Sequence, residues 1–274
     1  MQSLLIPEIS QVYDNRFHYR THAEVKNNIN GNPGFYQKES HNLISFPKKG
    51  CLLLAKPLLQ FLSDSPKQKQ KGYKIAMSYT NHCSSSINLD SVTEELEKKI
   101  SYKRDISLFF QANQFLRSRM LEIVEKYSDL SSSDTFLDIG CGVGFFTLLC
   151  ASHAKKGVGI DINSKSIQWA KHNAKQNRCD NVSFIGQSVP DIHPYRSNYH
   201  VVIIDPPRSG ISKRDRKSIC TIAPHHIVYV SCNPTTFSRD CRDFISYGYS
   251  LKGLTLIDMF PGTFHIEVIA LLTK

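Results

Sequence analysis

The feature that most constrains the fold is a regular alternation of short apolar runs and amphipathic segments from residue 136 onward. Short apolar runs bounded by turn signals are typical of buried strands, and the segments between them have helical spacing. This alternation predicts a doubly wound α/β sheet with its ligand site at the carboxyl ends of the strands. The predicted strands are 136–139, 157–160, 182–185, 200–204, 227–230, 254–257 and 265–272, and the predicted helices begin near 145 and cover 164–176, 212–222 and 235–247.

The first hundred residues lack this regularity. We expect a short lead-in over 1–18 and extended pieces after it, with a helix over 56–63, a loop at 84–86 and a charged helical turn over 94–99. A helix is predicted over 111–127. We therefore expect a reduced N-terminal and central α+β region over 1–105 and a catalytic domain over 106–274.

The charge distribution favours a polyanionic partner. The chain of 274 residues has a formal net charge of +10, and 41% hydrophobic residues support a sizeable core. Between Arg16 and Lys74, eleven Lys or Arg residues stand against three acidic ones. A basic excess of this kind fits nucleic acid, although a basic cytosolic enzyme would show it too.

The eight cysteines and the apolar runs bear on location. No two cysteines have a Cys-x-x-Cys spacing, so we expect no zinc or other metal site. No secretory signal is expected, and the longest apolar runs are far too short to span a bilayer. We expect a cytoplasmic protein with free thiols, no membrane contact and no required protein partner.

A glycine-rich loop over 138–144 follows the first predicted strand and points to a cofactor. Glycines let the backbone turn tightly and approach a ligand closely, and we assign Asp138, Gly140 and Gly142 to this site. The spacing is Gly-x-Gly-x-Gly, which disfavours a nicotinamide dehydrogenase because those enzymes use Gly-x-Gly-x-x-Gly.

Two later residues extend the predicted cofactor site. Asp161 ends the second strand, where a carboxylate can accept hydrogen bonds from both ribose hydroxyls of an adenosine. Gln187 follows the third strand, where it could contact adenine. The alternative is a tight packing turn with Asp161 as a helix cap.

The motif Asp205-Pro-Pro-Arg208 ends the fourth strand at the same predicted edge. Enzymes that methylate exocyclic amines carry a similar motif with an aromatic residue in the fourth position. Arg208 stands there instead, which argues against amine methylation and leaves ring-carbon chemistry open. We assign Asp205 and Arg208 to substrate binding, with Asp205 also near the cofactor.

Cys232 ends the fifth strand in Ser-Cys-Asn-Pro, where its thiol should face the cofactor edge. A pyrimidine C5 is too weakly nucleophilic to attack a sulfonium methyl group. A thiolate that adds at C6 makes C5 reactive, and a base must then remove the C5 proton before the thiolate leaves. Cys232 is the predicted nucleophile, and the alternative is a small buried packing residue.

Glu267 is the predicted base. A carboxylate within an apolar strand is costly unless it is paired or used, and desolvation would raise its pKa toward that of a proton acceptor. The alternative is an exposed strand face or an ion pair. His265, two residues earlier, could orient the base or pack.

Together these motifs resemble the RNA uracil-5-methyltransferases over residues 17–274. The resemblance rests on Phe109-Phe-Gln-Ala-Asn113, the loop at 138–144 and the segments around Asp205, Cys232 and Glu267. It implies S-adenosylmethionine (SAM) as cofactor, with Gln111 and Asp161 contacting it. It also implies that Asp205 lies beside the target base and that Cys232 and Glu267 are nucleophile and base.

The N-terminal part is similar to the branch that modifies 23S ribosomal RNA, through Tyr19-Arg20, Pro33–His41 and Cys51-Leu-Leu-Leu. Those enzymes usually begin with a small RNA-binding barrel and a four-Cys iron–sulfur cluster. This chain begins too late for the barrel, and only Cys51 resembles a cluster ligand. We therefore expect no iron–sulfur cluster.

The expected partner is RNA, ribosomal rather than transfer RNA. The target uridine must leave its stack to reach Cys232, and aromatics can then hold unstacked bases. Phe110 is a predicted base contact and Arg20 a predicted phosphate contact. Three alternatives stay open: the same chemistry on tRNA, a SAM-dependent enzyme for RNA cytosine or a small molecule, and a catalytically silent RNA-binding protein.

Overall fold

The chain forms two compact units, as the computed structural model shows. It describes residues 7–37, 40–47, 50–65, 71–87, 92–188 and 199–274. Unit 1 comprises 1–14, 97–102 and 116–274, and unit 2 comprises 15–96 and 103–115. The units therefore interleave along the chain, whereas the sequence analysis places a single boundary between 105 and 106.

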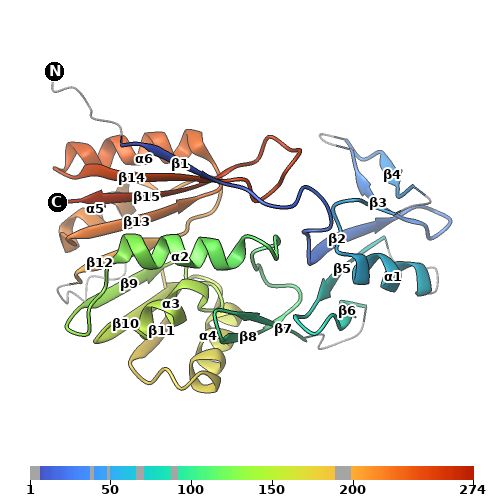
Figure 1. Ribbon diagram of the computed structural model, residues 1–274, viewed down its shortest axis with the longest axis horizontal. Coiled ribbons are helices and arrows are strands. Elements are labelled where there is room, and N and C mark those ends of the chain that lie inside the picture. The colour runs from blue at the N-terminus through green and yellow to red at the C-terminus, as the bar shows by residue number, and fades with distance from the viewer. Residues whose placement is uncertain (1–6, 38–39, 48–49, 66–70, 88–91, 189–198) are drawn as a thin grey trace. The chain divides into compact units, whose positions relative to one another are not determined.

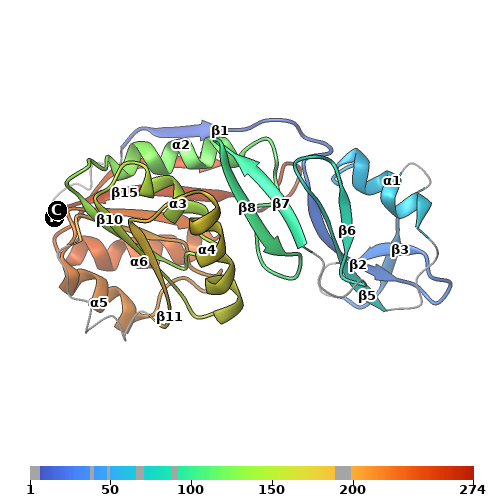
Figure 2. The same cartoon turned by 90° about the horizontal axis from the view of Figure 1, so that it is seen from below.

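Unit 1 is built on an eight-stranded sheet (Figures 1 and 2). All neighbouring strands are parallel except at β15, which runs antiparallel to both its neighbours. In spatial order the strands are β1 (Ile9–Val12), β14 (Ser250–Ile257), β15 (Glu267–Thr273), β13 (His226–Ser231), β12 (Val201–Ile204), β9 (Thr135–Ile139), β10 (Lys156–Asp161) and β11 (Val182–Gly186).

Helices cover both faces of this sheet. Helices α2 and α3 lie over one face and α5 and α6 over the other (Figures 1 and 2). The bounds are α2 (Arg117–Ser128), α3 (Phe145–Ala151), α4 (Ser164–Gln176), α5 (Lys213–Ile222) and α6 (Pro234–Ser246). This is the doubly wound α/β fold that the sequence predicts.

The core explains why the central strands are continuous apolar runs. All four residues of β12 are buried, as expected for a parallel strand covered on both faces. Tyr229, Phe244 and Ala270, from β13, α6 and β15, are fully buried in the same cluster. The two longest helices of unit 1 begin with side-chain caps: Asn163 accepts from two backbone N–H groups of α4, and Asn233 accepts from Thr235 N in α6.

Unit 2 contains a five-stranded antiparallel sheet with one helix, an α+β arrangement. The sheet order is β4 (Leu43–Ser45), β3 (Pro33–Tyr36), β2 (His22–Asn27), β5 (Gly72–Met77) and β6 (Cys83–Ser85), and the helix is α1 (Lys56–Asp64). Val25, Leu58 and Ile75 are fully buried in its core. The strands β7 (Val92–Glu97) and β8 (Ile100–Asp105) pair with each other as a separate two-stranded sheet.

Four local predictions are wrong. The expected lead-in contains strand β1, and the expected loop at 84–86 contains the end of β6. The expected helical turn at 94–99 is mostly strand, because Glu95 and Glu97 alternate inward and meet buried arginines, Arg104 and Arg117. The helix expected from 111 begins only at Arg117. Residues 112 and 114 instead hydrogen-bond to the backbone of residues 19 and 21.

Candidate active site

The carboxyl ends of the parallel strands in unit 1 bring the predicted residues to one edge of the sheet. The cofactor loop follows β9, Asp161 ends β10, and Gln187 follows β11. Asp205 follows β12 and Cys232 follows β13. Glu267 reaches the same edge from the other direction, because it is the first residue of the antiparallel strand β15.

The glycine-rich loop makes a close turn against the neighbouring strands. Gly140 has a φ of +79°, and an added Cβ would lie 2.5 Å from the Asp205 carbonyl oxygen, so only glycine fits. The Gly142 N–H donates to Asp161 Oδ2 at 2.9 Å, which ties the loop to the end of β10. A Cβ at Gly142 would meet nothing within 4 Å, so open space lies above the loop.

Two buried polar atoms at this edge have no hydrogen-bond partner among the described residues. They are Asp138 Oδ1 and Gln187 Nε2. The other oxygen of Asp138 accepts from Thr147 Oγ1 at 2.5 Å. Burial raises the pKa of Asp138 to about 7, despite that hydrogen bond, and the nearby Asp161 adds to the rise. Native proteins rarely leave such atoms unsatisfied, so both are candidates for ligand contacts.

Asp205 is fixed by its backbone, whose N–H donates to the Ile139 carbonyl at 3.0 Å. The residue keeps partial contact with solvent. Even so, dense surrounding protein atoms raise the pKa of its carboxyl well above its usual value, and Glu267 and Asp138 raise it further. The neighbouring carboxyls of Glu267 and Asp138 therefore disfavour the charged form of Asp205.

Cys232 and Glu267 are brought together by strand register. Ser231 pairs with Val268 across β13 and β15, and Cys232 and Glu267 are the next residues beyond that pair. Glu267 is 6% exposed, and burial raises its pKa to about 7, with Arg208 acting to lower it. Burial also raises the pKa of the half-buried Cys232 thiol, and the Glu267 and Asp205 carboxyls raise it further.

Arg208 supplies a positive charge near Cys232 and Glu267 at this edge of the sheet. Its positive charge opposes the pKa rise of both Cys232 and Glu267. Its Nη2 lies 3.0 Å from Nδ1 of His265, two residues before Glu267. His265 therefore contacts the substrate-binding candidate Arg208.

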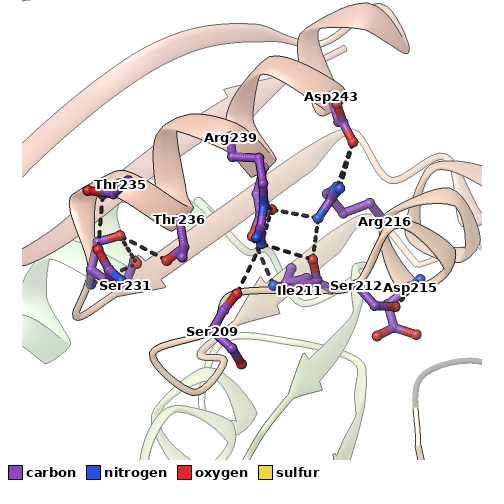
Figure 3. Close-up of polar contacts among 12 residues, drawn as sticks. Ser209, Ile211, Ser212, Asp215, Arg216, Ser231, Thr235, Thr236, Arg239 and Asp243 are labelled. Carbon is purple, nitrogen blue, oxygen red and sulfur yellow. Dashed lines mark hydrogen bonds and ion pairs between the residues drawn. The ribbon is translucent and has the colours of Figure 1, made fainter.

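The loop that carries Arg208 is held by the first turns of α6. The Arg208 carbonyl accepts from Asn233 Nδ2 at 3.1 Å and from Thr236 Oγ1 at 3.2 Å. Arg239 reaches the Ser209 carbonyl at 3.0 Å (Figure 3). Because α6 begins directly after Cys232, one helix positions both the thiol and the loop of Arg208.

A buried acid completes this attachment. Asp240 is fully buried and accepts from the Ile211 N–H at 2.9 Å and from Arg216 Nη1 at 2.6 Å. Arg216 also donates to the Ile211 carbonyl and to Asp243 (Figure 3). Gly210 has a φ of +72°, and an added Cβ would lie 2.5 Å from Asp240 Oδ2.

The other predicted site residues belong to unit 2. Gln111 is buried at 6% exposure. Arg20 is half-buried, its Nε donates to the His22 carbonyl at 2.9 Å, and burial lowers its pKa. Phe110 is 2% exposed and packs against the Arg104 guanidinium, so its ring is not available for stacking.

Sequence reasoning missed two exposed apolar residues beside the predicted sites. Phe109, next to Phe110, is 74% exposed, and Ile162, next to Asp161, is 83% exposed. No local signal separates Phe109 from Phe110, because both are phenylalanines in the same motif. Ile162 could have been found as an apolar residue directly after the ribose-binding candidate.

The described residues contain no group of three or more His, Cys, Asp or Glu side chains that could hold a metal ion. All eight cysteines have free thiols, and Cys51 is half-buried. Within the same ranges no helix is both long and apolar enough to cross a bilayer.

The fold and this edge define a class, an α/β protein with a glycine-rich cofactor loop and a thiol beside a buried carboxyl. The profile of the family described as tRNA (uracil-5-)-methyltransferase matches residues 69–274. The chain belongs to this family, as the sequence resemblance implies.

Relatives of known sequence agree with this placement. An uncharacterized RNA methyltransferase of Caldanaerobacter subterraneus is 36% identical over 68% of this chain and 41% of its own length. The 23S rRNA (uracil(1939)-C(5))-methyltransferase RlmD of Pasteurella multocida is 36% identical over 62% of this chain and 40% of its own length. The chain thus spans about four tenths of the length of these relatives.

Among solved structures, the Pyrococcus abyssi tRNA (uracil-54, C5)-methyltransferase in complex with S-adenosyl-L-homocysteine has a TM-score of 0.74. It is 22% identical, and the match covers 97% of this chain and 79% of that one. At this identity the likeness concerns the fold, which it confirms.

Proposed function

We propose that this chain uses SAM to methylate C5 of a uridine in RNA, with Cys232 as nucleophile and Glu267 as base. The observation that carries the proposal is the register of β13 and β15, which brings a thiol and a buried carboxyl to the edge of the cofactor loop. Family membership supports the same chemistry. A cytoplasmic location is part of the proposal.

The residues present fit SAM. Asp161 has one hydrogen bond to each carboxylate oxygen and keeps lone pairs for ribose hydroxyls. The unpartnered Gln187 Nε2 can donate to adenine, and the unpartnered Asp138 Oδ1 can meet a polar group of the methionine part. The exposed Ile162 would pack on the adenine ring. The open space above Gly142 leaves room for the ligand backbone.

The proposed chemistry assigns one task to each side chain. Bound SAM would supply an electrophilic methyl group, with S-adenosylhomocysteine as the leaving group once the bond between sulfur and methyl breaks. The Cys232 thiolate adds to C6 of the uracil, and the electron pair moves to C5 and O4, so that C5 becomes nucleophilic. Once C5 carries the methyl group, Glu267 removes the C5 proton. The C6–S bond then breaks and restores the ring double bond. A pKa of about 7 suits Glu267 to accept a proton near neutral pH.

Ribosomal RNA is the proposed substrate, because curated relatives such as the Pasteurella multocida protein are named as 23S rRNA enzymes. Transfer RNA is the second candidate, since the family description and the Pyrococcus abyssi structure name it. We assign RNA contact to residues 1–105 as well. In the motif at 109–113, just after this region, the exposed Phe109 replaces the buried Phe110 as the stacking candidate.

Covalent trapping tests the proposal. The protein and SAM are incubated with ribosomal and transfer RNA transcribed with 5-fluorouridine, and RNA that stays attached after denaturation is sequenced. Fluorine cannot leave as a proton, so we expect a stable adduct between Cys232 and methylated RNA. The recovered sequence identifies the substrate.

The matched control is Cys220→Ala, since Cys220 is also a half-buried free thiol but lies on α5. We expect the adduct to persist in Cys220→Ala and to vanish in Cys232→Ala. Binding of SAM without any adduct would instead indicate a silent RNA-binding protein or another target, and the nucleophile assignment would be withdrawn.

A further inference from the structure

The loop between β14 and β15 presents an exposed aromatic side chain next to the proposed active site. Phe264 is 69% exposed, three residues before the buried Glu267. Single exposed apolar residues are common and need no explanation by themselves. Phe264 differs because its ring is part of an ordered cluster that reaches the active-site cation.

The cluster consists of Phe264, His265 and Arg208. The Phe264 and His265 ring centroids are 4.1 Å apart with an interplanar angle of 47°. His265 Nδ1 lies 3.0 Å from Arg208 Nη2, and Arg208 in turn acts on the pKa of both Cys232 and Glu267. Phe260, nearer the start of the same loop, packs edge-on against His265, with the two ring centroids 6.0 Å apart. The three planar groups therefore adjoin one another in a row that ends at Arg208, the arginine that acts on Cys232 and Glu267.

The loop itself is held in place. Thr263 donates from its backbone N–H and from Oγ1 to the Phe260 carbonyl, at 3.1 and 2.7 Å. The His265 N–H donates to Thr263 Oγ1 at 3.2 Å. Met259 and Pro261 are buried on one side and Glu267 on the other. The turn thus fixes its backbone by its own bonds while the Phe264 ring faces solvent.

An unpaired nucleobase fits this cluster. Bases stack on aromatic rings, and a guanidinium beside the ring can pair with the phosphate that the base carries. A uridine that enters the site must leave its stack, which also deprives the adjoining base of a neighbour. We propose that Phe264, supported by His265, stacks on the base that directly adjoins the target uridine in the RNA. This inference rests on the proposed function.

A thermodynamic cycle between the protein and the RNA tests this site. Hairpin RNAs with a randomised loop are selected for binding to the wild-type protein, and the strongest binder becomes the probe. Each loop nucleotide is then replaced in turn by an abasic site. The affinity of every RNA is measured for wild type and for Phe264→Ala, and the 5-fluorouridine form of the probe identifies the uridine that reacts.

We expect Phe264→Ala to weaken binding of the intact hairpin by about 5- to 150-fold, the range for loss of one base–aromatic stack. An abasic site at one position adjoining the reactive uridine should weaken RNA binding by the wild-type protein by a similar factor. The same abasic site should weaken RNA binding by Phe264→Ala little further. Phe264→Trp should restore the affinity. Tyr247→Ala, which removes a 40% exposed ring at the end of α6, is the control and should change binding less than 2-fold.

The outcomes separate this site from the proposed function. Equal weakening of every RNA by Phe264→Ala, with no coupling to any loop base, would overturn the stacking site and leave a structural role. Coupling to a loop base other than a neighbour of the reactive uridine would overturn the assigned position. Coupling without any covalent adduct would support a base-stacking site and refute the proposed methylation.

Discussion

Asp240 and Glu267 are both buried acids that lie next to β13, yet their surroundings are opposite. Asp240 accepts from Arg216, Arg239, Tyr229 and the Ile211 N–H, all within 2.9 Å. The Glu267 carboxyl accepts no side-chain or backbone hydrogen bond among the described residues, and burial raises its pKa to about 7. A buried acid surrounded by donors holds structure together, whereas one left without them is available for proton transfer.

The sharpest test of this contrast is the turnover of Glu267→Gln. The amide keeps the size of the side chain but cannot accept the C5 proton. We expect methyl transfer to fall by about 10²- to 10⁴-fold, with the methylated Cys232 adduct accumulating on ordinary RNA. Denaturing gels measure the adduct. Near-normal turnover in Glu267→Gln would place the base elsewhere.

Of the substitutions of Asp240 and Glu267, Asp240→Ala should change the free energy of unfolding most. It leaves the guanidinium of Arg216, whose side chain is 7% exposed, without its buried carboxylate. We expect a loss of about 3 to 5 kcal/mol in the free energy of unfolding, followed by urea denaturation at pH 7. The control is Asp215→Ala in the first turn of α5, because the Asp215 backbone N–H donates to Ser212 Oγ at 3.1 Å and the variant keeps that bond. A loss in Asp240→Ala no larger than in that control would refute the structural role.

The pH dependence of stability should reveal the raised pKa of Glu267. The pKa of Glu267 rises from 4.5 to about 7 on folding, so the native state binds the proton more tightly than the unfolded chain. The cost of ionising Glu267 is absent below pH 4.5 and grows as the pH rises toward 7. We expect Glu267→Gln to gain up to about 3 kcal/mol over wild type between pH 5 and pH 8. A difference that is constant with pH would show that the carboxyl is not perturbed.

The smallest expected effect comes from Thr236→Val, which removes one of two side-chain donors to the Arg208 carbonyl. Loss of one hydrogen bond should cost about 0.5 to 1.5 kcal/mol of stability. If the bond also positions Arg208, the rate of adduct formation should fall a further few-fold. The matched variant is Thr221→Val, which removes a similar bond within α5. The positioning role fails if both variants form the adduct at the wild-type rate.

Much of unit 1 could be predicted because its information is local. Apolar runs and caps define β9 to β13 and α3 to α6 within a few residues, and parallel strands necessarily place their following loops at one edge. The neighbouring positions of Cys232 and Glu267 could not be derived in this way. They depend on β15 lying antiparallel between β13 and β14, a pairing that no local pattern encodes.

The failures arise where distant residues decide the structure. Glu95 and Glu97 suggested an exposed helical turn, but their charges are buried beside Arg104 and Arg117. Likewise, Phe110 rather than Phe109 is buried because the Arg104 guanidinium packs over its ring. Partners six to twenty residues away along the chain decide the structure in each case.

The pairing of β1 with β14 has a consequence for synthesis of the chain. Ser10 Oγ lies 2.7 Å from Thr255 Oγ1, across 245 residues of sequence. At about 5 to 20 residues per second, a ribosome needs on the order of 10 to 50 s to make the residues between them. During that time β1 has left the ribosome while its partner strand does not yet exist. The pairing of β1 with β14 at the edge of the sheet is therefore among the last events of folding, and β1 stays unpaired until then.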